Sequence, residues 1–418
     1  MRPLNDFLKT EAAGGVVLFI ATVTALMWAN LPLVSDSYGE FWTIKVNLLD
    51  VSLPLVKWVN DGLMAVFFLV VGLEIKRELV SGELARPRSA SLPVVAALGG
   101  MAVPALLYLA LNGGREGASG WGIPMATDIA FVLGVLALLG RRVPPSLKTF
   151  LLAVAIVDDI GAILLIALVY TDDLSLLWLG AGVVTLGLGA VLLRVGIDNL
   201  VVYAAVGLVA WIAVHESGVH ATLVGVLLGL ITPARPDVGP AVMRRLGARV
   251  VASFRSGSTA AGAADLEGGG RERIALLERL EHTLHPWSSF AIVPVFALAN
   301  AGVKFDGDAI EGLLTSRVSL GVIVGLVVGK LTGILLSVFA ATKIGISELP
   351  QGTGWLHMVA AGLLAGIGFT VAIFIGSVAF DSETLVVKAK LGIFGASMLA
   401  GAAGYLLMRV TAREVVAN

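Results

Sequence analysis

The chain has 418 residues, of which 57% are hydrophobic and 14% are charged, and its mean hydropathy is +0.92. Soluble domains are more charged and less apolar, so most of this chain must face lipid or other apolar helices. The net charge of −1 provides no basic field for nucleic acid, and the lack of cysteine excludes disulfides, thiolate catalysis and cysteine-based metal sites.

About twelve apolar stretches approach the roughly 20 residues that a helix needs to cross a bilayer. The first is longer than the apolar core of a signal peptide, so we interpret it as a retained helix. The pattern predicts an all-α integral membrane protein with one polytopic domain over residues 1–418. The predicted membrane helices are 11–30, 57–76, 90–112, 121–140, 149–170, 176–194, 200–214, 219–232, 287–303, 318–341, 356–380 and 388–408.

The distribution of Lys and Arg predicts the orientation of these helices. With twelve spans, most basic residues fall on the side that holds both termini, and the positive-inside rule places that side in the cytoplasm. On that side, residues 255–270 are rich in Gly, Ala and Ser, which indicates a flexible linker. On the other side, residues 42–57 alternate polar and apolar positions around a polar turn. They predict either a short external β-hairpin or an irregular loop.

Four ionisable residues fall near the middle of predicted membrane helices. Asp128 lies in the fourth helix, Asp158 and Asp159 lie in the fifth, and Lys330 lies in the tenth. A charge at the bilayer centre costs at least about 2.5–3.5 kcal/mol on insertion scales, so each one implies an ion pathway or a partner. A structural ion pair could explain any one of them, but four at one depth favour a functional site.

Adjacent helical aspartates point about 100° apart, so both can line one cavity. Two carboxylates this close repel each other, which lets at least one exchange protons near neutral pH. Their oxygens are also hard ligands that suit a small hard cation. Asp158 and Asp159 therefore form a site that can hold either a cation or protons, and Lys330 is the expected counter-charge.

Two predicted helices contain residues that favour local unwinding. Pro124, Thr127 and Asp128 interrupt the fourth helix, and three glycines with Thr370 interrupt the eleventh. Interruptions at corresponding positions of two halves are typical of inverted-repeat transporters, although glycine-rich packing of an ordinary helix also explains the eleventh. We expect helices 3–5 and 10–12 to be the repeats, with helices 4 and 11 crossed, and opposed half-helix ends balanced by Asp128 and Lys330.

The predicted repeats divide the domain into two bundles. Residues 90–170 and 318–408 would form a core transport bundle, and residues 11–76 and 176–303 an interface or panel bundle. Within the tenth helix, glycines recur every four residues from Gly321 to Gly333, which predicts a surface that packs closely against a neighbouring helix.

Several motifs together resemble the NhaA family of bacterial sodium/proton antiporters, which is itself one of the examples behind the inverted-repeat rule. They cover nearly the whole chain and include Gly329-Lys330. The others are GLEIKREL (72–79), ATDIAF (126–131), IVDDIGAI (156–163), GVHATL (218–223), LEHTLHPW (280–287) and FALANAGV (296–303). The resemblance implies a protein of the bacterial inner membrane, usually a homodimer, that exports Na⁺ or Li⁺ in exchange for protons and needs no cofactor.

The resemblance also assigns roles to residues of these motifs. It implies cation and proton exchange at Asp158 and Asp159, which would be the ligands of the transported Na⁺ or Li⁺, and a pair between Lys330 and Asp158. Thr127 would belong to the helix crossing, and Asp128 and Lys330 would balance the half-helix termini. A cytoplasmic region that regulates activity by pH would contain Glu74, Arg77, Glu281, His282 and His285.

The pH-regulatory region includes an amphipathic segment over residues 271–285. In it, Glu278 and His282, and likewise Glu281 and His285, stand four residues apart, which suits charge pairs that titrate near neutrality. A solvated helix with incidental histidines is the alternative. If 42–57 forms a hairpin, its exposed edge could pair with a second copy across a two-fold axis.

Two other functions share some of these sequence features. Intramembrane proteases also use paired aspartates, but usually from separate helices, whereas Asp158 and Asp159 are sequence neighbours. A sodium-coupled organic-anion symporter could share the crossed broken helices. It would need further polar or aromatic groups beside the carboxylates, and the sequence contains no convincing cluster of them. A channel or a structural protein would not couple cation movement to proton movement.

Overall fold

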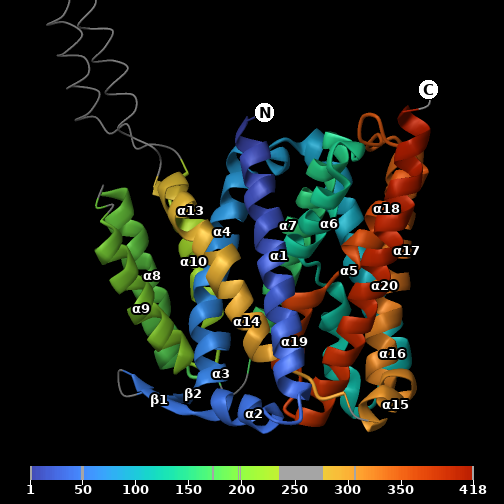
Figure 1. The fold of residues 1–418 in the computed structure, drawn as a ribbon. Helices are drawn as coiled ribbons and strands as arrows, with labels where there is room; N and C mark the ends of the chain where they lie inside the picture. Colours follow the sequence, from blue (N-terminus) through green and yellow to red (C-terminus); the bar gives the residue numbers. More distant parts are fainter. Residues whose placement is uncertain are drawn as a thin grey trace, which may run out of the picture.

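The computed structural model describes residues 2–48, 51–171, 174–195, 197, 199–234, 276–305 and 307–416. The predicted linker at 255–270 lies outside these ranges. The helices run mostly side by side, with α8 and α9 at one end of the molecule and α16, α17, α18 and α20 at the other (Figure 1). The chain termini lie on one face, here called the termini face, and the β-hairpin lies on the opposite face, called the hairpin face (Figure 1).

The first third of the chain contains the hairpin and four membrane-crossing runs. Strands β1 and β2 pair antiparallel, with Lys45 opposite Pro54, which confirms the predicted hairpin. The elements are α1 (Arg2–Asn30), α2 (Ser35–Thr43), β1 (Lys45–Leu48), β2 (Val51–Pro54), α3 (Leu55–Lys57), η1 (Trp58–Leu63), α4 (Met64–Ser81), η2 (Glu83–Ala85), α5 (Pro87–Asn112), η3 (Glu116–Met125), α6 (Ile129–Leu139) and η4 (Gly140–Arg142).

The remaining elements continue the helical pattern up to the C-terminal helix. They are α7 (Pro145–Val169), α8 (Leu176–Arg194), α9 (Leu200–His215), α10 (Thr222–Ile231), α13 (Leu276–Trp287), η5 (Ser288–Ile292), α14 (Val293–Asn300), α15 (Gly307–Thr315), α16 (Arg317–Ile323), η6 (Val324–Gly329), α17 (Lys330–Ile344), α18 (Trp355–Ala365), α19 (Phe369–Ala379) and α20 (Glu383–Val416). Each predicted membrane segment coincides with one of these helices or with a joined run of them.

Length and hydropathy support the membrane assignment. Within the described ranges, six helices are long and apolar enough to cross a membrane, and two bent pairs raise the number of such spans to eight. The other four predicted spans are not long and apolar enough by this measure, and each has a physical reason. The helices α9 and α10 are short, α4 carries charges in its last turns, and α14 is joined through η5 to the amphipathic α13. The fold is thus an all-α, multi-pass membrane protein.

Both predicted interruptions are present, and they are the two bent pairs. The chain turns by 41° between η3 and α6 and by 44° between α18 and α19. The segment before the first bend, Glu116–Met125, is a 3₁₀-helix, and Pro124 lies within it. Because these two pairs occupy corresponding places in helices 3–5 and 10–12, the architecture agrees with the predicted inverted repeat.

The tenth helix packs through its glycine ridge, as predicted. A Cβ atom at Gly329 would lie 2.7 Å from Pro104 Cα, and one at Gly333 would lie 2.1 Å from the Gly99 carbonyl oxygen, so α5 approaches this ridge at backbone distance. The helix is π-helical from Val324 to Gly329, directly before Lys330. This close packing fixes the position of Lys330 between the two repeats.

Candidate functional site

The two helix breaks meet and bond to each other near the centre of the molecule. The Asp128 backbone N–H donates to the Ile367 carbonyl over 2.6 Å. The Thr127 hydroxyl lies 3.0 Å from the Ala365 carbonyl oxygen at the end of α18. Backbone groups that a break frees cannot be satisfied by lipid, so each break must find partners inside the protein. Here each break supplies partners for the other.

Asp128 lies between the N-termini of α6 and α19. Its Oδ1 accepts from the Phe131 N–H at 3.0 Å, which makes it the N-cap of α6. Its Oδ2 accepts from the Thr370 N–H at 2.9 Å and from the Thr370 hydroxyl at 2.6 Å in the first turn of α19. Helix N-termini carry partial positive charge, so one buried carboxylate interacts favourably with both.

Lys330 lies on the opposite side of the crossing, where it contacts a helix C-terminus. Its Nζ is 2.8 Å from Asp158 Oδ2, and neither side chain is exposed. The same ammonium donates to the carbonyl of Met125, the last residue of η3. The Thr127 hydroxyl lies 2.7 Å from Asp158 Oδ2, so Asp158 is bound to the crossing by two side chains.

Asp159 has different surroundings from its sequence neighbour. It lines a cavity of about 60 Å³, whereas Asp158 does not. The Oδ1 atom of Asp158 is buried and accepts no hydrogen bond from the described part of the chain. The cavity is lined by Gly14, Leu18, Phe67, Val70, Val71, Glu74, Thr127, Asp128, Ile129, Ala130, Asp159, His285, Ser288, Ser289, Val293, Thr370 and Val371. It therefore reaches from the helix crossing to Glu74 and His285 on the termini side.

Three buried phenylalanines lie on the hairpin side of this cavity. Each is three residues further toward the hairpin face than a cavity-lining valine, on α4, α14 and α19 respectively. Ring centroids are 5.4 Å apart for Phe68 and Phe374 and 6.3 Å apart for Phe296 and Phe374. All three rings are at most 3% exposed. This aromatic layer, Phe68, Phe296 and Phe374, separates the cavity from the hairpin face.

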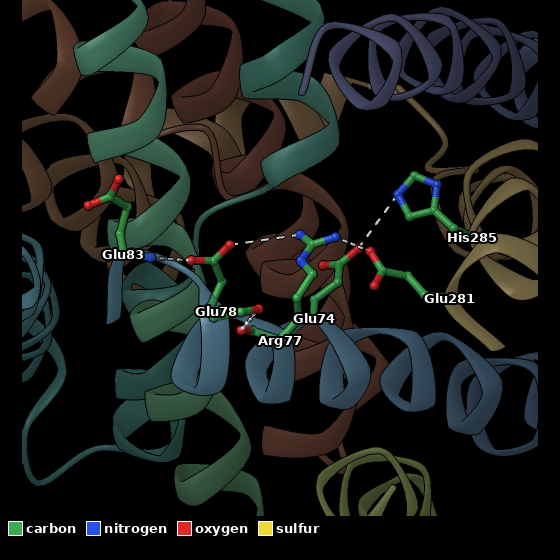
Figure 2. A network of polar contacts seen from close by, with 7 residues as sticks. Glu74, Arg77, Glu78, Glu83, Glu281 and His285 are labelled. Atoms are coloured by element: carbon green, nitrogen blue, oxygen red, sulfur yellow. Dashed lines mark hydrogen bonds and ion pairs between the residues drawn. The ribbon is translucent and has the colours of Figure 1, made fainter. Parts of the chain in front are cut away.

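A polar network joins α4 to α13 on the termini side (Figure 2). Arg77 forms an ion pair with Glu281 and lies 3.8 Å from Glu78. Nε2 of His285 is 3.6 Å from Glu74 Oε1. Since His285 and Glu74 also line the cavity that contains Asp159, this network is continuous with the candidate exchange site.

The structure brings nine of the ten predicted site residues into two connected groups. One group is the crossing with its carboxylates and Lys330, and the other is the α4–α13 network. His282 is exposed on α13 and lies outside both. The predicted intrahelical pair of Glu281 with His285 is replaced by pairs with Arg77 and Glu74 on α4, because the two buried side chains face that helix.

Sequence reasoning did not identify three contributors to the site. The sequence marks Thr370 only as a polar residue in an interrupted helix, whereas in the structure it donates two hydrogen bonds to Asp128. The Met125 carbonyl and the aromatic layer were not predicted. The carbonyl has no sequence signal, whereas the repeated valine-to-phenylalanine spacing of three residues could have indicated the layer.

Crossed broken helices around buried charges define an inverted-repeat membrane transport fold, a class for which the NhaA family is itself a standard example. The model of the family described as Na+/H+ antiporter 1 matches residues 5–408. The chain is 48% identical to the Na(+)/H(+) antiporter NhaA of Oleidesulfovibrio alaskensis, covering 99% of this chain and 95% of that one. It is 45% identical to the Na(+)/H(+) antiporter NhaA of Escherichia coli O6:K15:H31, covering both in full. The chain belongs to this antiporter family.

Proposed function

We propose that the chain is a sodium/proton antiporter, a transporter rather than an enzyme, and that Asp159 and Asp158 carry the exchange. The observation that carries this proposal is the unequal environment of the two carboxylates. Asp159 lines the cavity, while Asp158 is bound by Lys330 and Thr127. The names of the relatives support sodium and protons as the transported ions.

The exchange uses competition between ions for the same oxygens. A carboxylate is a hard ligand for Na⁺ or Li⁺ only while it is ionised, so a proton on Asp159 releases the cation and a bound cation excludes the proton. A cation that also reaches Asp158 weakens its attraction to Lys330, because the positive charges then compete for one carboxylate. Cation binding is in this way coupled to the contacts at the crossing.

Alternating access follows from the position of the aromatic layer. The cavity extends toward the termini face, and the aromatic layer closes it toward the hairpin face. Transport then requires the crossing to move relative to α4 and α14, which contribute Phe68 and Phe296. In this movement Asp128 and Lys330 compensate the charges of the half-helix ends that they contact. The crossing would move with a core bundle of residues 90–170 and 318–408 against a panel of 11–76 and 176–303.

The α4–α13 network is proposed to regulate activity by pH without binding the transported cation. Histidine is the residue type that ordinarily changes charge near neutral pH, and a His285 imidazolium would attract the Glu74 carboxylate whereas a neutral imidazole would not. Since both side chains line the cavity, the change alters the approach to Asp159. Glu281 and Arg77 keep α13 attached to α4 across this range.

The protein is proposed to function in the bacterial inner membrane as a homodimer, with both termini cytoplasmic. In this orientation the cavity extends toward the cytoplasm, from which Na⁺ is exported against incoming protons. The excess of Lys and Arg predicted on that side supports the orientation. The hairpin supports the dimer because its strand edges can pair with those of a second copy.

The organic-anion symporter is not favoured. The relatives named above are sodium/proton antiporters by name, and neither is named as an organic-anion transporter. The test of antiport uses proteoliposomes that enclose a pH-sensitive dye. Added Na⁺ or Li⁺ must move protons in the wild type. No movement with either cation, or equal movement by Asp159→Asn, would contradict the proposal.

A further inference from the structure

The two half-helices that precede the bends differ in conformation, although they occupy corresponding places in the two repeats. The half-helix of the second repeat, α18, is an ordinary α-helix, whereas η3 is a 3₁₀-helix of 10 residues. Because its hydrogen-bond geometry is poorer than that of an α-helix, a 3₁₀-helix rarely extends beyond about four residues. Contacts with the surrounding protein must therefore stabilise η3 in this form.

Two tyrosine hydroxyls bind the backbone of η3 near its start. Tyr108 of α5 donates to the Gly117 carbonyl over 2.8 Å. Tyr170, the residue that follows α7, donates to the Ser119 carbonyl over 2.6 Å. Both side chains are buried, with Tyr108 0% and Tyr170 9% exposed. A Cβ atom at Gly120 would lie 2.6 Å from the Tyr108 hydroxyl, so the absence of a side chain there lets this tyrosine approach the backbone.

The 3₁₀ form determines how far η3 reaches from these hydroxyls. Its other end is Met125, whose carbonyl accepts a hydrogen bond from the Lys330 ammonium. A 3₁₀-helix rises about 2.0 Å per residue and an α-helix about 1.5 Å. The path from Ser119 to Met125 is therefore about 3 Å longer than it would be in an α-helix. An α-helical η3 would be too short to reach the partners at both ends at once.

We propose that Tyr108 and Tyr170 are positioning residues of the exchange site, which act through η3 on Lys330. The Met125 carbonyl and the Asp158 carboxylate share the ammonium of Lys330. Without the two hydroxyls η3 can shorten, and the ammonium then interacts more strongly with Asp158. A transported cation meets a stronger competitor for that carboxylate, so it binds more weakly. This inference rests on the antiport and the cation site proposed above.

The experiment uses phenylalanine variants of the full-length protein, which remove each hydroxyl and keep the ring. The control is Tyr203→Phe, because the Tyr203 hydroxyl donates to the Leu228 carbonyl and joins α9 to α10. In proteoliposomes, Tyr108→Phe and Tyr170→Phe are expected to raise the Na⁺ concentration for half-maximal proton movement roughly threefold to tenfold, as for one lost hydrogen bond. The control is expected to keep the wild-type value. A purely structural role would lower the amount of folded protein and leave this concentration unchanged.

Amide deuteration of the same variants in detergent tests the contacts of η3 without ion movement. Peptides that cover Glu116–Met125 are expected to take up deuterium faster in Tyr108→Phe and Tyr170→Phe than in the wild type and in Tyr203→Phe. An unchanged half-maximal Na⁺ concentration in both variants, an equal rise in Tyr203→Phe, or unchanged deuteration of η3 would overturn the inference and leave the antiport unaffected. A wild type that moves no protons in response to Na⁺ would instead overturn the antiport, and this inference with it.

Discussion

The ammonium of Lys330 and the carboxylate of Asp158 are 2.8 Å apart, and both side chains are fully buried. Removing one partner of a buried ion pair leaves a charge without compensation, which typically costs about 3–5 kcal/mol. We therefore expect Lys330→Met to lower the thermal unfolding temperature in detergent. Adding Asp158→Asn to that variant is expected to restore much of the stability. If the double variant were as unstable as the sum of the single ones, the pair would not be coupled.

The two aspartates are expected to differ in how their substitution impairs exchange. Asp159→Asn removes the carboxylate that lines the cavity, so cation-induced proton movement falls to the level of empty liposomes. Asp158→Asn also impairs exchange severely, but through loss of the Lys330 contact, and it alters stability as well. The measurement is dye dequenching at several Na⁺ concentrations. Normal rate and apparent affinity in Asp159→Asn would exclude the proposed site.

The aromatic layer is predicted to prevent leakage between the two sides. Phe374→Ala removes the ring that contacts both Phe68 and Phe296. The loss of this ring opens a gap on the hairpin side of the cavity. We expect faster proton or Na⁺ entry into liposomes without exchange of the other ion. Phe394→Ala is the control, because Phe394 lies outside the aromatic layer. Its ring centroid is 5.5 Å from that of Phe369. Equal leakage from the two variants would remove the layer from the barrier.

The two histidines of α13 differ in their contacts, so their substitutions are expected to differ in effect. His285 lies 3.6 Å from Glu74, whereas His282 is exposed. His285→Ala removes the imidazole that lies beside Glu74, so the activity–pH curve is expected to move. His282→Ala is expected to leave the curve in place. Exchange measured from pH 5 to pH 9 tests both, and a shift in His282→Ala alone would contradict the assignment.

Deletion of residues 45–54 removes both strands of the hairpin. The site lies within one subunit, so we expect a weaker dimer but appreciable antiport. Subunit mass in mild detergent and proteoliposome exchange are measured together. A deletion variant that stays fully dimeric would remove the hairpin from the interface. A monomeric but wholly inactive variant would contradict a site that is complete in one subunit.

The sequence predicted the parts of the structure that depend on local composition. Apolar length located the membrane helices, and Pro124 with the neighbouring Thr127 and Asp128 located one helix break. The rest depends on contacts between distant segments. Thr370 and Asp128 are 242 residues apart, and nothing in either motif specifies their hydrogen bonds. The rotation that separates Asp159 from Asp158 is likewise set by the helices packed around α7.

The contacts of α13 with α4 also could not be predicted from the sequence. A spacing of four residues predicts that Glu281 and His285 pair with each other along one helix. In the fold both are buried against α4, where Arg77 and Glu74 offer partners across the interface. Periodicity alone does not reveal which neighbouring helix a polar face will meet.

The bonding between the two breaks also constrains how the protein is made. Asp128 enters the membrane early in synthesis, while its donor Thr370 is synthesised 242 residues later. Until α18 and α19 insert, the Asp128 carboxylate lacks both hydrogen bonds from Thr370, and the Asp128 N–H lacks the Ile367 carbonyl. The first repeat therefore reaches its native form only after the second is synthesised. A nascent chain truncated before α18 keeps a carboxylate and backbone groups in the membrane without these partners, which is energetically unfavourable and can be recognised by cellular quality control.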